Sequence, residues 1–208
     1  MKLIELTVND YLDLLKSDAP APGGGSVSAL AGAQGAALVA MVCDLTTSKK
    51  KWEAEHEHAA AVKEEADALY ADLKAAIDAD TDAFNLIAAA FKMPKETDEE
   101  KAARKKAIAD GTLEATKVPY GVMKMGAKGL DLAERLYGHF NTNCASDLGV
   151  AVLNFMACIK GAWLNVKINL PGVKDEAFAA ECEATGKEIM EKYEAIARRL
   201  YAQIEEEL

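Results

Sequence analysis

Hydrophobic residues recur along most of the chain at alternating intervals of three and four, which is the spacing of one face of an α-helix. The longest stripe predicts a helix over about 52–91, and the last one predicts a helix over about 174–207. Prolines, glycines and capping residues divide the remainder into further expected helices, over about 7–17, 26–47, 98–118, 119–137 and 146–170. No run of residues alternates like a β-strand between turn signals. The pattern therefore predicts an all-α fold, a single-domain helical bundle over residues 1–208.

Local signals set the expected ends of several helices. Thr7 and Asp10 have the spacing of a capping box before the first helix, and Ser26 is expected to cap the second. Pro119 is expected to be either a kink or the start of a new helix. The stripe of the third helix is apolar except for one carboxylate, and it comprises Val62, Ala66, Leu69, Leu73, Ile77, Asp80, Phe84, Ile87 and Phe91.

Two of the expected helices, 26–47 and 146–170, are unusually apolar. The first contains the uncharged segment 27–43, but its alanines, glycines, serine and glutamine differ from the about 20 strongly apolar residues that a membrane span needs. We therefore expect a buried helix whose small residues, Ala29, Gly32, Ala33 and Ala36, allow a second helix to approach closely. Two largely apolar central helices carry more apolar surface than one small bundle hides, so a homodimer or a larger assembly is predicted.

Composition and charge narrow the class of protein. Alanine, the best helix former, makes up roughly a fifth of the chain, far above its ordinary usage. The net charge of −10 argues against a nucleic-acid partner and against a polybasic membrane anchor. The first ten residues lack the apolar core of a signal peptide, and the four cysteines are widely separated. These cysteines are expected to be buried thiols of a cytoplasmic protein, rather than a zinc cluster or a disulfide framework.

Two features carry candidate chemistry near the start of the second helix and on the third. The first is a turn that consists of Gly23, Gly24, Gly25 and Ser26. Its backbone N–H groups lie beside the positive end of a helix dipole, which suits a carboxylate, a phosphate or an electron-rich carbonyl, although a tight loop with a serine cap is equally consistent. The second is Asp80, the only charged residue on the stripe of the third helix. A carboxylate on an apolar face is either a structural group capping another helix or a tuned catalytic acid or base.

Basic residues form a local exception to the acidic character of the chain. Lys50 and Lys51, together with Lys49, follow the second helix, where they meet the negative end of its dipole. The same cluster is a basic patch of the kind that an anionic ligand needs, and Lys95 is similar. The sequence leaves both interpretations open.

Polar residues also flank the helix expected over 146–170. Asn141 and Asp147 are favourable capping residues near its start, although the Asp147 carboxylate would also lie at the mouth of a very apolar helix. Asn165 and Asn169 are four residues apart and share one face of this helix. They either bind polar groups of a ligand or satisfy backbone groups.

The histidines do not predict a metal site. Glu55 and His58 have the Glu-x-x-His spacing that occurs in di-iron bundles, but such sites need a second copy and further inward-facing glutamates. The sequence contains no second copy, and no Ser-His-Asp or Cys-His arrangement can be assigned. We therefore expect no metal.

Five groups of these residues occur in a characteristic order. They are Pro22-Gly-Gly-Gly-Ser26, Lys49-Lys-Lys51, Asp80-Thr-Asp-Ala-Phe84 with Met93-Pro-Lys95, Asn141 with Ser146-Asp147, and Asn165-Val-Lys-Ile-Asn-Leu170. Together they resemble the cyclodeaminase/cyclohydrolase family of folate enzymes, which includes the C-terminal domain of formiminotransferase-cyclodeaminase and free-standing bacterial methenyltetrahydrofolate cyclohydrolases. The resemblance covers nearly the whole chain. It implies an all-α, homodimer-based fold with a folate site near the subunit interface.

The resemblance also implies an activity. Methenyltetrahydrofolate cyclohydrolase is the expected function, and formiminotetrahydrofolate cyclodeaminase is the alternative; a tetrahydrofolate derivative is the substrate and no separate cofactor is expected. Asp80 matches the catalytic aspartate of the family's D-x-x-A-F motif and would move a proton, while Asp147 and Asn141 would orient the pterin or the water. The residues expected to bind substrate are Gly23, Gly24, Gly25, Ser26, Lys50, Lys51, Lys95, Asn141 and Asn165. An alternative of another class is a helical interaction module in which Asp80 forms only a structural ion pair.

Overall fold

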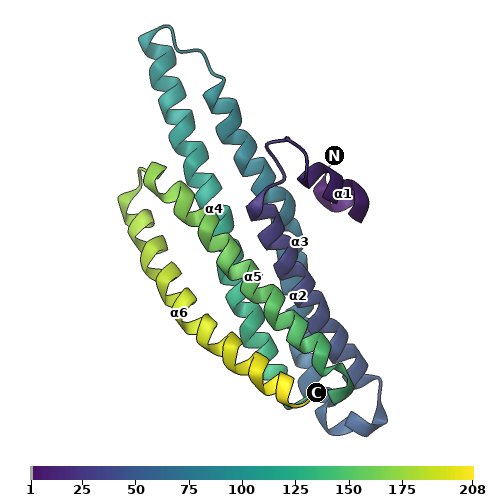
Figure 1. Cartoon of the computed structure of the whole chain (residues 1–208). Coiled ribbons are helices and arrows are strands. Elements are labelled where there is room, and N and C mark those ends of the chain that lie inside the picture. The colour runs from purple at the N-terminus through teal and green to yellow at the C-terminus, as the bar shows by residue number, and fades with distance from the viewer. Residues whose placement is uncertain (1) are drawn as a thin grey trace.

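The computed structural model describes residues 2–208, and within that range the chain is helical and contains no strand (Figure 1). The α-helices are α1 (Val8–Leu15), α2 (Gly24–Thr47), α3 (His56–Phe91), α4 (Asp98–Leu136), α5 (Ala145–Asn169) and α6 (Glu176–Glu206). Short 3-10 helices are η1 (Leu3–Glu5), η2 (Lys50–Glu55), η3 (Thr142–Cys144) and η4 (Leu170–Gly172). The predicted all-α class is therefore confirmed.

Helix α2 packs against both α3 and α5, and small residues make these contacts close. A methyl group at Gly32 would lie 2.7 Å from the sulfur of Cys158 in α5 and 2.9 Å from Cδ2 of Leu73 in α3. A methyl group at Gly35 would lie 2.9 Å from the ring of Phe155 in α5. The expectation that small residues of this helix allow close approach is confirmed. The four cysteines are free and buried, which also agrees with the sequence.

Helix α4 runs continuously from Asp98 to Leu136 and contains Pro119, so the predicted division into two helices at this proline is wrong. A proline inside a helix leaves the carbonyl four residues earlier without its backbone donor. That carbonyl belongs to Ala115, and the side-chain amide of Asn169 in α5 donates to it at 2.8 Å. Asn169 thus supplies the hydrogen bond that Pro119 removes, which allows the helix to continue.

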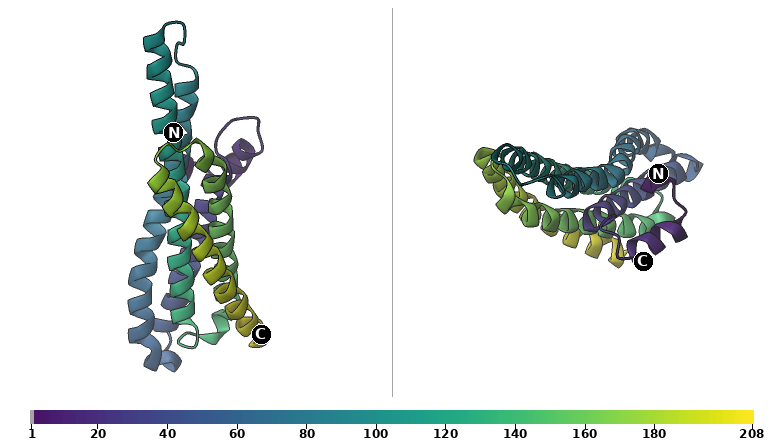
Figure 2. Two further views of the ribbon diagram at one scale, coloured as in Figure 1. Left: turned by 90° about the vertical axis from the view of Figure 1, so that its left-hand side faces the viewer. Right: turned by 90° about the horizontal axis from the view of Figure 1, so that it is seen from above.

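Helices α3 and α4 form a hairpin whose tip projects beyond the other helices (Figure 1 and Figure 2). The stripe of α3 is buried inside the bundle, as at Leu69 and Leu73, but Phe84 is 38% exposed and Phe91 is 57% exposed. The stripe is therefore a core face only until α3 passes the start of α2. Asp80 lies at this boundary, where the buried part of α3 gives way to the projecting part.

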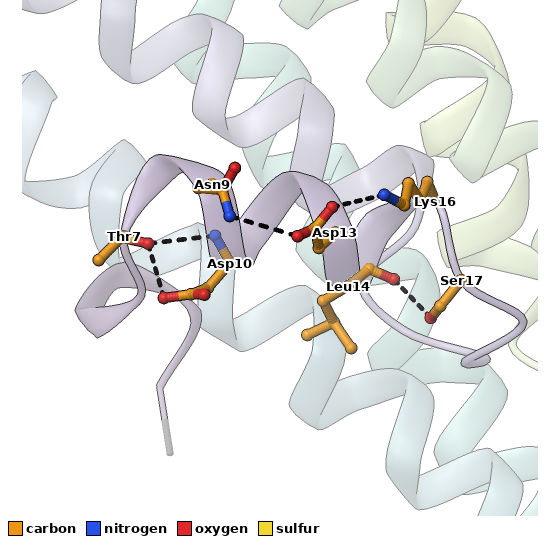
Figure 3. A network of polar contacts seen from close by, with 7 residues as sticks. All are labelled: Thr7, Asn9, Asp10, Asp13, Leu14, Lys16 and Ser17. Carbon is orange, nitrogen blue, oxygen red and sulfur yellow. Dashed lines mark hydrogen bonds and ion pairs between the residues drawn. The ribbon is translucent and has the colours of Figure 1, made fainter.

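A hydrogen bond connects the N-terminal segment to α3. The hydroxyl of Thr7 accepts a hydrogen bond from the backbone N–H of Asp10 at 3.1 Å, which confirms the predicted cap of the first helix (Figure 3). The same hydroxyl donates to the Asp10 carboxylate at 2.6 Å (Figure 3). Before α1, the backbone N–H of Leu3 donates to Oδ1 of Asp78 at 2.5 Å. This bond holds η1 against α3 and thereby positions α1.

Two stretches between residues 2 and 208 are long and apolar enough to cross a membrane by length and composition alone. They are α2, whose most apolar part is 61% buried, and Thr142–Gly172, whose most apolar part is 44% buried. The core helices of folded domains meet the same two criteria, so length and composition are weak grounds for a span.

Candidate active site

Helix α2 begins at Gly24, and Gly23 before it has an extended backbone and no side chain with which to cap the helix. Ser26 lies inside the first turn, so the prediction that it caps the helix is wrong. Its hydroxyl instead donates to Oδ2 of Asp80 in α3 at 3.1 Å. The helix starts two residues earlier than predicted, and the Asp80 carboxylate from α3 accepts from the backbone N–H of Ser26 in its first turn, where N–H groups have no partner within the helix.

The Asp80 carboxylate fits against this first turn because residue 25 is glycine. A Cβ atom at Gly25 would overlap the carboxylate of Asp80. The hydroxyl of Thr81 joins the cluster, at 3.2 Å from the hydroxyl of Ser26. The structure thus brings three residues that the sequence singled out, Gly25, Ser26 and Asp80, into direct contact.

The surroundings of Asp80 favour the protonated form of its carboxyl more than an exposed position on the protein surface would. Burial raises the pKa of Asp80 above its ordinary value of 3.8, while hydrogen bonds from the hydroxyl and backbone of Ser26 act in the opposite direction. Burial has the larger effect, although the N-terminus of α2 also favours negative charge. A carboxyl whose pKa is raised in this way exchanges its proton nearer to neutral pH, as a general acid or base must.

Two further side chains border the Asp80 cluster. Burial and the charge of Asp80 raise the pKa of the Tyr11 phenol, and the Tyr11 hydroxyl is buried without a hydrogen-bond partner. Asn165 of α5 reaches the start of α2, since a Cβ atom at Gly24 would lie 3.3 Å from its Nδ2. The same Nδ2 donates to the carbonyl of Gly161 at 2.9 Å. Helices α1, α2, α3 and α5 therefore all contribute to the surroundings of Asp80.

Sequence reasoning missed Tyr11 and Thr81. Thr81 follows Asp80 directly, and one step along a helix takes a residue off the apolar stripe. Tyr11 is the aromatic residue of the first expected helix, but its approach to Asp80 depends on the path of the proline- and glycine-rich segment 19–25. No spacing in the sequence specifies that path.

A second group of expected site residues lies at the opposite end of α2. Lys50 and Lys51 begin η2, just beyond the C-terminus of α2, and a helix of this length spans about 36 Å. Asn141 is buried at the same end, and its side-chain amide donates to the carbonyl of Leu45 at 3.2 Å. Asp147 lies in the first turn of α5, and α5 begins at this same end of the bundle. The fold of the single chain therefore does not bring these residues to Asp80.

The remaining contacts of this group favour capping. Oδ1 of Asn141 accepts from the backbone N–H of Asn143 at 3.2 Å, so both ends of the Asn141 amide satisfy groups of the chain itself. Lys95 is exposed in the connection between α3 and α4, at the tip of the projecting hairpin. It is thus separated from Asp80 by the last three turns of α3.

The described part of the chain, residues 2–208, has no group of three or more His, Cys, Asp or Glu side chains arranged to hold a metal ion. Glu55 contacts Nδ1 of His139 at 2.8 Å, and Nε2 of His58 lies 2.7 Å from the carbonyl of Arg135. The Glu-x-x-His pair therefore has other contacts at the outer surface.

Replacing Ser26 with alanine is expected to raise the pKa of Asp80 further. The substitution removes a hydroxyl that donates to the carboxylate, and such a bond favours the charged form. The pKa is measured from the pH dependence of the carboxyl ¹³C chemical shift of Asp80. Ser28→Ala is the matched control, because the hydroxyl of Ser28 donates to the carbonyl of Gly24 at 2.6 Å. An unchanged pKa in Ser26→Ala, or an equal shift in both variants, contradicts the prediction.

The fold and the site define a class: an all-α protein that holds a half-buried carboxylate with a raised pKa at a helix N-terminus. The chain belongs to the formiminotransferase-cyclodeaminase family, whose family model matches residues 7–202. It is 40% identical over 195 residues to methenyltetrahydrofolate cyclohydrolase of Methylorubrum extorquens, and the match covers 94% of each chain. The family resemblance read from the sequence is therefore confirmed.

Two other relatives place the chain within this family. It is 34% identical over 179 residues to formimidoyltransferase-cyclodeaminase of Sus scrofa, covering 86% of this chain and 33% of that protein. The chain thus spans about a third of the length of that relative. The crystal structure of formiminotetrahydrofolate cyclodeaminase from Thermotoga maritima matches the fold with a TM-score of 0.80 at 25% identity, covering 100% of this chain and 98% of that one.

Proposed function

We propose that this protein is an enzyme, a methenyltetrahydrofolate cyclohydrolase that hydrolyses 5,10-methenyltetrahydrofolate to 10-formyltetrahydrofolate. The observation that carries the proposal is the half-buried Asp80 carboxyl at the N-terminus of α2, whose pKa is raised by burial. The relative from Methylorubrum extorquens, which matches this chain over 94% of both lengths, is named for this activity and supports the choice.

The proposed reaction forms one C–O bond, breaks one C–N bond and moves protons, all at or next to one carbon. Asp80 removes a proton from water as its oxygen bonds to the cationic carbon between N5 and N10 of the folate. The bond from this carbon to N5 then breaks, and Asp80 returns its proton to N5. The hydroxyl of the adduct loses its proton to solvent and becomes the carbonyl of the formyl group on N10. One proton is released overall, and no separate cofactor is required for this step.

A second candidate reaction suits the same carboxyl. The fold matches a formiminotetrahydrofolate cyclodeaminase over its whole length, and that likeness favours this alternative. In that reaction N10 attacks the formimino carbon on N5, and the proton of N10 passes to the imino nitrogen. The resulting amino group takes up a second proton and leaves as ammonia. Asp80 in its protonated form is the donor for this leaving group.

Two assays on the purified protein separate these reactions. Loss of the absorbance of methenyltetrahydrofolate, above its spontaneous hydrolysis, is expected if the protein is a cyclohydrolase. Release of ammonia from 5-formiminotetrahydrofolate, without that hydrolysis, would establish the cyclodeaminase instead. If neither substrate turns over and neither binds, the helical interaction module becomes the better account.

The proposed enzyme acts as a homodimer. Helix α5 presents an apolar face to solvent, on which four aliphatic side chains are between 47% and 78% exposed: Val150, Leu153, Leu164 and Ile168. An apolar stripe of this length on a surface helix is typical of a protein interface. If a two-fold axis lies perpendicular to the long axis of the bundle, the helices of the two copies are antiparallel. The end of one copy that carries Lys50 and Lys51 then approaches the end of the other copy that carries Asp80.

A mixed-subunit experiment tests whether the site is shared. Asp80→Asn and Asp147→Ala are each expected to be inactive alone, because each shared site then lacks one of the two carboxylates. When the two variants are coexpressed, about a quarter of the wild-type activity is expected to return, since random pairing leaves half of the dimers with one intact site of two. The absence of any recovery from two inactive variants, or a monomer in light scattering, contradicts the shared site.

A further inference from the structure

A cavity of about 540 Å³ lies between α1, α2 and α3, adjacent to the Asp80 cluster. Its walls are mostly aliphatic, with Leu12 from α1 and Leu30 from α2, and the ring of Tyr70 closes part of the α3 side. Lys74 carries the only charge among the lining residues that the structure describes. The volume lies in the range of small-molecule pockets, whose walls are mainly apolar with a few polar groups.

Tyr11 connects this cavity to Asp80. Its ring lines the cavity, only 8% of the residue is exposed, and its hydroxyl is buried without a hydrogen-bond partner. Ile77 lines the same cavity and lies one turn before Asp80 on α3. An unpaired buried hydroxyl is unfavourable in the free protein, so a polar atom of a ligand that reaches it gains a ready partner.

Lys74 sets the other end of the cavity. It is exposed, and its ammonium group lies 5.7 Å from the centroid of the Tyr70 ring. Lys74 and Asp80 are six residues apart on α3, so they are separated by about 9 Å along the helix axis. The cavity therefore extends from the buried hydroxyl of Tyr11, on which the charge of Asp80 acts, to the cation of Lys74, and its walls between them are aromatic and aliphatic.

We propose that this cavity binds the aminobenzoylglutamate half of a reduced folate, with the benzoyl ring between Tyr11 and Tyr70 and the glutamate carboxylate paired with Lys74. The inference rests on the proposed function, because it places the reacting carbon beside Asp80. That carbon is bonded to N10, which is also the aniline nitrogen of the aminobenzoyl group. When this carbon lies at Asp80, the flat benzoyl ring follows it and the glutamate carboxylate lies farthest from Asp80. The cavity has the same order, with the two tyrosine rings first and the ammonium group of Lys74 beyond them.

The test uses the intact protein and 4-aminobenzoylglutamate, with binding measured by isothermal titration calorimetry. We expect this compound to bind and to compete with methenyltetrahydrofolate, and we expect Lys74→Ala to weaken its binding by about tenfold. 4-Aminobenzamide, which has the ring but no carboxylate, is expected to bind the parent protein and Lys74→Ala equally. Lys187→Ala is the matched control, since Lys187 lies on α6 and pairs with Glu183. This control is expected to bind aminobenzoylglutamate as the parent does.

Turnover provides a second readout. Lys74 contacts a part of the substrate that does not react, so Lys74→Ala is expected to raise KM by about tenfold while kcat stays within about twofold. Failure of aminobenzoylglutamate to bind, equal binding to the Lys74→Ala and Lys187→Ala proteins, or dissociation of a dimer by Lys74→Ala would each overturn the inference; the last would show that a second copy covers the cavity. An active enzyme with no effect of Lys74→Ala rejects this site alone, whereas aminobenzoylglutamate binding without turnover of either folate rejects the proposed function.

Discussion

Replacing Asp80 with asparagine is expected to reduce kcat by about 10²- to 10⁴-fold, the range over which a positioned acid or base contributes to a reaction. Asparagine has nearly the shape of aspartate and still accepts the hydrogen bond from Ser26, but it cannot take a proton from water or return one to N5. The measurement is the steady-state rate of methenyltetrahydrofolate hydrolysis, corrected for the spontaneous reaction.

The same substitution is expected to leave the protein at least as stable at pH 7 as the parent. Because the pKa of Asp80 is raised in the folded state, the native protein binds the proton more tightly than the unfolded chain. The stability that Asp80 contributes is therefore present below its unfolded pKa of about 3.8 and is lost as the pH rises through its higher folded value. Thermal unfolding of both proteins between pH 4 and pH 7 is expected to show an advantage of Asp80→Asn that grows with pH.

Asp82→Asn is the matched control for both measurements. Asp82 lies on the same helix, is exposed, and is two residues away from Asp80, so it points off the stripe. We expect it to retain the parent's turnover and the parent's dependence of stability on pH. Near-normal turnover by Asp80→Asn contradicts the assignment of Asp80 as the acid or base. A large loss of stability at neutral pH contradicts the direction of its pKa shift.

The helical pattern predicted the fold well because the core imposes its period on the sequence. Pro94 correctly predicted the end of α3 near Phe91, and Pro171 correctly predicted the break between α5 and α6. The division at Pro119 was wrong because the compensating donor, Asn169, comes from another helix. The start of α3 was placed too early because residues 50–55 form a 3-10 turn with a kink.

The site was only partly predictable for a related reason. Asp80 stands out because a single carboxylate on an apolar stripe requires an explanation wherever the stripe packs. The partners of a residue are a different matter, since they depend on how helices are arranged in space. The order of motifs along the chain suggested one site, yet the lysines and Asn141 lie at the far end of α2 from Gly25. Motif order therefore predicts membership of a family more reliably than it predicts which residues meet.

Replacing Gly25 with alanine is expected to lower both stability and activity. Its new Cβ atom would overlap the Asp80 carboxylate, and α2 and α3 are packed too closely along their length for the backbone to move freely. We expect a loss of about 1–3 kcal/mol in the free energy of unfolding, which is typical of overpacking in a dense interior. Because the carboxylate is pushed away from Ser26, kcat/KM is expected to fall by about 10²-fold, as a small misplacement of a reacting group does. Denaturant unfolding and steady-state kinetics give the two quantities.

A double variant separates the steric cause from a general effect of alanine in this turn. In Gly25→Ala/Asp80→Ala the overlapping carboxylate is absent, so most of the lost stability is expected to return while the activity does not. Such non-additivity is expected only for residues in contact. Gly121→Ala in α4 is the control for adding a methyl group to a helical glycine, because a Cβ atom there has no neighbour within 4 Å. If Gly25→Ala unfolds and turns over as the parent does, the Asp80 carboxylate does not occupy the first turn of α2. If the double variant is no more stable than Gly25→Ala, the loss of stability has a cause other than this overlap.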